Sequence, residues 1–103
     1  MRLAREEVFG PVLAIQVFDE PEEAIALANG TDYGLGASVW TADPERAYAI
    51  ASRMRTGCVA VNTPNLVDFT APFGGFKQSG LGRELGPEGI GPYTEYQSII
   101  YPC

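Results

Sequence analysis

Residues 36–62, with the sequence GASVWTADPERAYAIASRMRTGCVAVN, decide the predicted fold. The stretch Gly36–Thr41 passes from small residues to Val39 and Trp40, which is typical of a strand. The apolar run Cys58–Asn62 predicts a second strand. Because a helical pattern separates the two runs, we expect them to lie parallel and to be joined by a crossover helix.

The helical pattern starts at Asp43-Pro44-Glu45. A capping acid, a proline at the first helical position and a second acid in the first turn each favour a helix start. Apolar residues then recur at helical spacing, at Ala47, Ile50, Ala51 and Met54. Gly57 follows, and we expect it to provide a left-handed exit from the helix.

A further strand and a further helix are predicted upstream. The run Pro11–Phe18 is rich in branched and aromatic residues and predicts a mostly buried strand. A helix is expected from about Pro21 to Asn29, with Asp19 as its cap in a capping box and Gly30 as its terminator. The predicted fold class is therefore α/β, with a largely parallel sheet and crossover helices.

The amino-acid composition changes after Asn62. Residues 62–86 are rich in Gly, Pro and polar residues, and a loop of that length is uncommon in a domain unless it has a function. The stretch Tyr93–Tyr101 alternates loosely and predicts a terminal strand that pairs with a neighbouring sheet edge. We therefore expect a long Gly-rich loop, which is where function should be sought, followed by a terminal strand.

Composition excludes several classes of function. Seven Lys and Arg against thirteen Asp and Glu give a formal net charge of −6, which disfavours nucleic acid and membrane surfaces as partners. The apolar runs are too short to span a bilayer and no signal peptide opens the chain, so a cytoplasmic location is expected. The chain has no histidine, and its two cysteines lack metal-ligand spacing, so no metal site is predicted. Cys58 is interpreted as a buried structural residue, with catalysis as the minor alternative.

Five blocks of residues, in order along nearly the whole chain, resemble the C-terminal segment of the aldehyde dehydrogenase superfamily. They are Glu6–Val12, Ala28-Asn29 with Tyr33–Leu35, Val39–Thr41, Gly57 with Val61-Asn62, and Pro72–Glu84. The resemblance implies that the chain is a fragment of a larger aldehyde dehydrogenase fold. Residues 1–86 would form a partial catalytic-domain segment with an active-site loop at 63–86, and residues 87–103 a C-terminal helix turn and an oligomerisation strand.

The resemblance also implies roles for five residues. Glu7 would accept hydrogen bonds from ribose hydroxyls of NAD or NADP, and Phe9 would pack near the nicotinamide. Without the resemblance, Glu7 would be interpreted as a solvated acid before a strand. Phe73 would lie near the reacting centre of the substrate. Leu66 and Val67 would line the same substrate pocket, with surface or interface packing as an equal alternative.

The function that the resemblance implies is that of the C-terminal part of an NAD(P)-dependent aldehyde dehydrogenase, which oxidises an aldehyde to a carboxylic acid. No catalytic residue is predicted, because the family's Gly-Gln-x-Cys nucleophile motif is absent from the chain. The glycines of Gly80–Glu84 lack the pattern of a phosphate-binding loop. The isolated chain is therefore expected to be inactive, to bind NAD or NADP at most weakly, and to form homo-oligomers or self-associate through open sheet edges. The alternative is a free-standing remnant that acts as a binding or assembly module.

Overall fold

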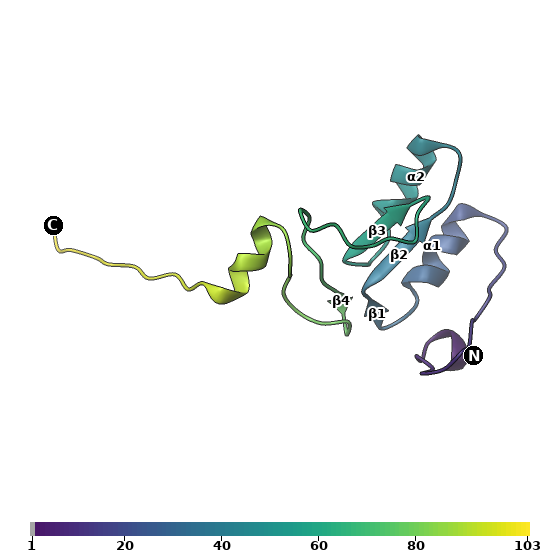
Figure 1. Cartoon of the computed structure of the whole chain (residues 1–103), viewed down its shortest axis with the longest axis horizontal. Coiled ribbons are helices and arrows are strands. Elements are labelled where there is room, and N and C mark those ends of the chain that lie inside the picture. Colours follow the sequence, from purple (N-terminus) through teal and green to yellow (C-terminus); the bar gives the residue numbers. More distant parts are fainter. Residues whose placement is uncertain (1) are drawn as a thin grey trace.

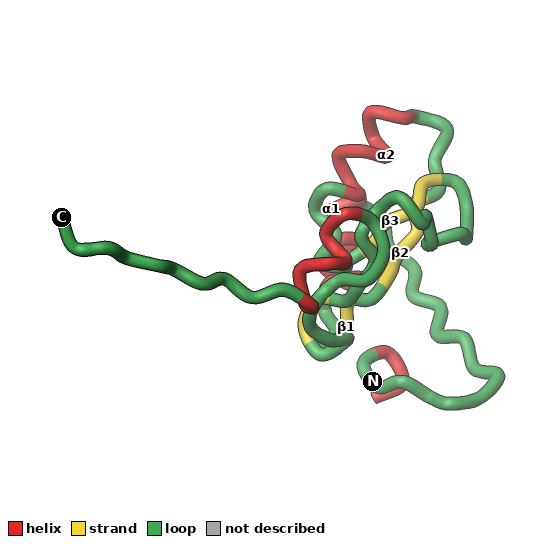
Figure 2. The backbone as a smooth tube through the Cα atoms, turned by 60° about the vertical axis from the view of Figure 1, so that its left-hand side comes forward, coloured by secondary structure: helices red, strands yellow, loops and turns green. Residues whose placement is uncertain are grey.

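The computed structural model describes residues 2–103. They form an N-terminal turn, residues 2–7, a packed unit, residues 19–93, and two extended arms (Figure 1). The N-terminal arm is residues 8–18 and the C-terminal arm is residues 94–103. The elements are, in chain order, η1 Arg2–Ala4, α1 Pro21–Asn29, β1 Tyr33–Gly34, β2 Gly36–Val39, α2 Pro44–Ala51, β3 Cys58–Val61, β4 Phe76–Lys77 and η2 Pro87–Tyr93. The C-terminal arm projects far from the packed unit in both views (Figures 1 and 2).

The predicted strand, helix and strand of residues 36–62 are confirmed. Strands β2 and β3 pair in parallel, with Gly36 opposite Cys58 and Val39 opposite Val61, and α2 connects them. Strand β2 ends at Val39, earlier than the expected Thr41. The side chain of Asn62 forms hydrogen bonds with both backbone groups of Thr41. Its Oδ1 accepts from Thr41 N (2.9 Å) and its Nδ2 donates to Thr41 O (2.8 Å).

Helix α2 starts as its capping residues predict. Asp43 Oδ1 accepts from Glu45 N at 2.9 Å and from Arg46 N at 3.2 Å, which satisfies two backbone donors of the first turn. The expected left-handed exit at Gly57 is wrong, because the helix already ends at Ala51 with Ser52 in a right-handed conformation. Gly57 is needed for a different reason, since a methyl group added to it would collide with the backbone carbonyl of Gly74.

Helix α1 has the predicted bounds, Pro21–Asn29, and buries Ile25. Its cap differs from the expected capping box. The capping position is Glu20, with no hydrogen bond from its side chain. Asp19 instead donates its backbone N–H to Glu23 Oε2 at 3.2 Å. The predicted end at Gly30 is confirmed, because Gly30 N donates to Leu27 O at 3.1 Å.

The expectation of one largely parallel sheet needs correction. The described residues form two separate two-stranded sheets, and β1 pairs with β4 in the antiparallel direction. Tyr33 lies opposite Lys77, and Gly34 opposite Phe76. This contact joins the end of α1 to the Gly-rich loop that follows β3.

Both arms depart from the predicted strands. Neither residues 11–18 nor residues 93–101 form a β-ladder, although both carry strand-like side chains. Leu13, Ile15 and Val17 expose 82%, 80% and 85% of their surface. A strand needs a neighbour to satisfy its backbone N–H and C=O groups, and no strand of the described residues lies beside either arm.

The buried core is small for a chain of this length. Among the described residues its apolar side chains are Ile25, Val39, Ala47 and Ala60. The accessible surface is 8546 Å², whereas a folded monomer of 11.1 kDa exposes about 5,700 Å². The Cα radius of gyration of 17.9 Å likewise exceeds the value of about 13 Å for a domain of this size. The arms account for this open shape. None of the described helices is long and apolar enough to cross a membrane.

Candidate functional site

Two adjoining hollows lie on either side of the β1–β4 contact. The first, called the Glu7 hollow, measures about 510 Å³ and is formed by residues around η1, the end of α1 and the start of β2. The second, called the Phe73 hollow, measures about 330 Å³ and is formed by the Gly-rich loop together with Pro92 and Tyr93. Leu35 and Ser79 line both hollows. The two spaces therefore share one wall.

The turn that presents Glu7 is held by its neighbours. Arg5 N and Glu6 N each donate to Arg2 O at 2.9 Å, and the Arg2 guanidinium donates to both carboxylate oxygens of Glu6, at 2.9 and 2.8 Å. The Arg2 guanidinium lowers the pKa of the Glu6 carboxyl from its ordinary value. Within residues 2–103, the Glu7 carboxylate makes no hydrogen bond or ion pair. It is therefore available to a ligand.

The shared wall rests on the β1–β4 contact. Gly34 N donates to Ser79 Oγ at 2.9 Å, and Gln78 N donates to Asp32 O at 2.9 Å. Lys77 has a left-handed backbone with φ of 55°, which is uncommon for a residue with a side chain. Its Nζ donates to the carbonyls of Asn29 (2.9 Å) and Thr31 (2.8 Å), so its ammonium caps the end of α1.

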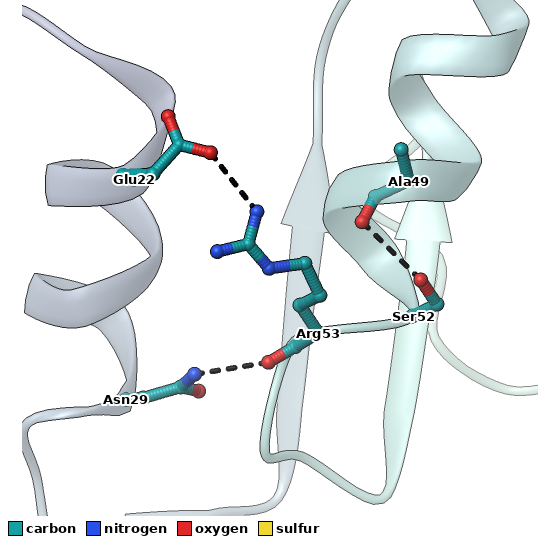
Figure 3. Close-up of polar contacts among 5 residues, drawn as sticks. All are labelled: Glu22, Asn29, Ala49, Ser52 and Arg53. Atoms are coloured by element: carbon teal, nitrogen blue, oxygen red, sulfur yellow. Dashed lines mark hydrogen bonds and ion pairs between the residues drawn. The ribbon is translucent and has the colours of Figure 1, made fainter.

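Asn29 ties the end of α1 to the segment that follows α2 (Figure 3). Its Nδ2 donates to Arg53 O at 3.0 Å and its Oδ1 accepts from Arg55 N at 2.7 Å. Arg53 also pairs with Glu22 at 3.1 Å. Because Met54 lies between the two clamped residues and lines the Glu7 hollow, these contacts fix part of the wall of that hollow.

The Phe73 hollow is bounded by the Gly-rich loop, which folds back on itself. Phe73 and Glu84 exchange two backbone hydrogen bonds of 2.7 Å. The Arg83 guanidinium donates to the carbonyls of Gly75 (3.0 Å) and Gly82 (2.6 Å) and lies 5.4 Å from the centre of the Phe76 ring. The loop is therefore cross-linked by polar contacts rather than by a packed apolar core.

Comparison with known proteins gives the family of the chain. The model of the aldehyde dehydrogenase family matches residues 1–99. This chain belongs to the aldehyde dehydrogenase family. It is 53% identical over 98 residues to geranial dehydrogenase of Castellaniella defragrans and 48% identical over 99 residues to betaine aldehyde dehydrogenase of Bacillus subtilis. The matches cover 95% and 96% of this chain but 20% of each relative, so the chain spans about a fifth of their length.

Solved structures of the family agree with this fold. The indole-3-acetaldehyde dehydrogenase AldA of P. syringae, a mutant in complex with NAD⁺ and IAA, matches with a TM-score of 0.88 and 54% identity over 92% of this chain and 19% of its own. The aldehyde dehydrogenase of Mycobacterium tuberculosis, in complex with NAD⁺, matches with a TM-score of 0.90 and 48% identity over 99% of this chain and 21% of its own. The chain is therefore part of a larger fold.

The structure brings together some of the residues predicted for an aldehyde dehydrogenase site and separates others. Glu7 and the half-buried Phe73 line the two adjoining hollows. Phe9 lies on the N-terminal arm and is 95% exposed. Leu66 and Val67 line a third hollow, of about 710 Å³, beside β3. The Sγ of Cys58 donates to Leu66 O at 3.0 Å there, and Cys58 is half-buried rather than buried.

Sequence reasoning missed the residues that join the two hollows. Ser79 and Leu35 stand in short polar or glycine-rich stretches, where neither periodicity nor spacing distinguishes them from ordinary loop residues. Ser79 meets Gly34 across 45 positions of sequence. No local sequence pattern predicts a contact between residues that far apart in the chain.

Proposed function

We propose that this chain forms two walls of the active site of an NAD(P)-dependent aldehyde dehydrogenase, which oxidises an aldehyde to a carboxylic acid. Glu7 lies on the cofactor side and Phe73 on the substrate side. The observation that carries the proposal is the shared wall of Leu35 and Ser79, because hydride transfer needs cofactor and substrate in adjoining spaces.

The residues of the Glu7 hollow suit the ribose next to the nicotinamide. A carboxylate without a protein partner can accept hydrogen bonds from both hydroxyls of a diol, and the Arg2–Glu6 pair leaves Glu7 free for this. When bound, NAD(P)⁺ supplies the acceptor for the hydride that the aldehyde loses. Phe9 would pack near the nicotinamide once the N-terminal arm is covered by the rest of the enzyme.

The residues of the Phe73 hollow suit an apolar wall for the aldehyde. The backbone of Phe73 is held by its two hydrogen bonds to Glu84, so the point at which its side chain leaves the loop is set. Leu66 and Val67 extend the proposed pocket only if the third hollow is continuous with it in the assembled enzyme. The nucleophile and the general base would come from the four fifths of the fold that this chain does not span. We therefore propose that the chain alone is inactive.

A hybrid enzyme tests the proposal. The segment of P. syringae AldA that matches this chain is replaced by residues 1–103, and the oxidation of indole-3-acetaldehyde by NAD⁺ is measured. We expect an active hybrid in which Glu7→Gln raises the KM for NAD⁺ about tenfold, the effect of one charged hydrogen-bonding partner. The matched control Glu45→Gln, on the exposed side of α2, should leave that KM unchanged. Equal kinetics of the two variants would refute the role of Glu7.

The substrate side is tested in the same hybrid. Phe73→Ala should raise the KM for the aldehyde or lower kcat, whereas Tyr48→Ala, at a 76% exposed residue of α2 that lines none of the three hollows, should change neither. For the chain by itself, adding NAD⁺ should raise the melting temperature little. A strong, saturable stabilisation would instead favour an autonomous binding module.

A further inference from the structure

Ser79 lies at the junction of the two hollows and is half-buried there. Its Oγ accepts a hydrogen bond from the backbone N–H of Gly34 at 2.9 Å. Gly34 is buried, and a methyl group added to it would collide with the carbonyl of Arg55. The backbone of β1 therefore approaches the neighbouring segment closely, and the hydroxyl of Ser79 holds it from the side of the Gly-rich loop.

The position of Ser79 is fixed from several directions. Ser79 N donates to Phe76 O at 3.1 Å, and the preceding Gln78 N donates to Asp32 O at 2.9 Å. A methyl group added to Gly75 would meet both the side chain and the backbone of Ser79, so the loop packs tightly around this residue. Because Ser79 is held from both sides, its hydroxyl group lies at a fixed place relative to Gly34.

We propose that Ser79 is a positioning residue that sets the separation between the cofactor wall and the substrate wall. The inference rests on the proposed function. The hydrogen bond from Gly34 N ties β1, and with it the adjoining Leu35, to the loop that carries Phe73. Without Oγ, the two walls lose this side-chain contact and keep the β1–β4 pairing with the Gln78 and Lys77 hydrogen bonds beside it. The distance between the bound aldehyde and the nicotinamide is then less tightly fixed.

The expected consequence is a slower hydride transfer with little change in binding. A misplacement of about 1 Å can lower a rate roughly 100-fold, and a loosened wall should have a smaller effect, about tenfold in kcat. Each ligand still meets its own wall, so both KM values should stay within about twofold of those of the unchanged hybrid. Hydride transfer should also become more fully rate-limiting.

The test uses Ser79→Ala in the hybrid enzyme, with an aldehyde that carries deuterium at the aldehyde carbon. We expect kcat to fall about tenfold and the deuterium isotope effect on kcat to rise. A variant that only unfolds part of the enzyme lowers the number of active molecules and leaves the isotope effect unchanged. The matched control is Ser52→Ala at the end of α2, whose Oγ donates to Ala49 O at 3.2 Å (Figure 3). It should leave kcat and the isotope effect as they were.

A second measurement follows the hydrogen bond itself in the 103-residue chain. Ser79→Ala should speed hydrogen exchange at the Gly34 amide, while exchange at Asn62, far from the contact, stays the same. A kcat within twofold of the unchanged hybrid, an unaltered isotope effect, or an unaltered Gly34 amide would each overturn the proposal. If the unchanged hybrid is active and Glu7→Gln behaves as expected, such a result counts against Ser79 alone; an inactive unchanged hybrid counts against the proposed function and this inference together.

Discussion

Strand β3 and residues 11–18 are both short apolar runs, yet only β3 is a strand in this structure. The helix α2 returns the chain so that β3 lies along β2, and Ala60 becomes buried. Residues 11–18 lead directly into α1, and no strand of the described residues lies beside them. The local composition of the two runs is similar. The difference lies in whether the chain supplies a partner.

This difference explains the open surface of the molecule. In the packed unit, helix caps, side-chain hydrogen bonds and short sheets provide partners for backbone N–H and C=O groups. The arms lack such pairing and expose apolar side chains such as Ile15 and Ile100. Surface of that kind marks contact with other protein. Since the chain spans about a fifth of its relatives, we propose that the rest of an aldehyde dehydrogenase fold, or a second copy of this chain, packs against the arms.

The largest effect expected is the contrast between two isoleucines. Ile25→Ala removes a buried side chain from a very small core and should lower the free energy of unfolding by about 2–4 kcal/mol. Ile15→Ala removes an exposed side chain of the N-terminal arm and should change it by less than about 0.5 kcal/mol. Urea denaturation followed by circular dichroism measures both. Equal losses would mean that the arm is packed in solution.

The arms should also control self-association. We expect the chain to associate, and the pair Ile15→Lys and Val17→Lys to weaken association at least about tenfold, because lysines on a strand edge oppose pairing. Sedimentation velocity over a range of concentrations gives the dissociation constant. The matched control is Tyr48→Lys with Leu81→Lys, two exposed positions outside the arms with the same change in charge. A chain that stays monomeric throughout, or a control that dissociates equally, would contradict the expectation.

The elements predicted well from sequence are those whose cause is local. The start of α2 follows from the Asp43 cap and Pro44, and both bounds of α1 follow from Pro21 and the turn after Asn29. The β1–β4 pairing was not predicted. Gly34 and Phe76 are far apart in the sequence, and no local pattern at either residue indicates that they pair. The expected strand at residues 11–18 was wrong, because a strand-like pattern does not show whether another strand lies beside it to pair with.

The candidate site divides in the same way. Glu7 and Phe73 were predicted as site residues from their resemblance to family motifs, and they line adjoining hollows. Their roles stay proposals. Ser79, at the wall between them, was not selected, because its position depends on the backbone of Gly34. Residue type can suggest a chemical role, but the distance between two walls is a tertiary property.

A smaller effect is expected at the cap of α2. Asp43→Ala removes the acceptor for two backbone N–H groups and should lower the free energy of unfolding by about 1 kcal/mol. Asp43→Asn keeps an acceptor oxygen and should recover most of that loss. Asp19→Ala is the comparison at α1, where the side chain does not cap the helix, and should have little effect. Urea midpoints distinguish the three variants, and a loss at Asp19 as large as that at Asp43 would mean that α1 is capped differently in solution.

The smallest effect concerns two exposed ion pairs within residues 2–103. One joins distant segments and the other is local. Glu22 meets Arg53 from α1 to the segment after α2, whereas Glu6 meets Arg2 within one turn before the N-terminal arm. The hydrogen bond from Arg53 is the main cause that lowers the pKa of Glu22, and that from Arg2 lowers the pKa of Glu6. A lowered folded pKa gives stability that is present above the ordinary value of 4.5 and is lost as the pH falls through the folded pKa.

Only the Glu22 pair links parts of the packed unit, so only its loss should change the unfolding transition. Glu22→Gln should shift the urea midpoint slightly at pH 7. The difference from the unchanged chain should begin to shrink as the pH falls below 4.5 and vanish below the lowered pKa of the folded state, and it should also shrink when salt screens the pair. Glu6→Gln should leave the midpoint unchanged at every pH, because its local turn can form and break without the packed unit. An equal shift for both variants would show that the turn before the N-terminal arm unfolds together with α1 and α2, and the boundary between arm and packed unit would then have to be moved.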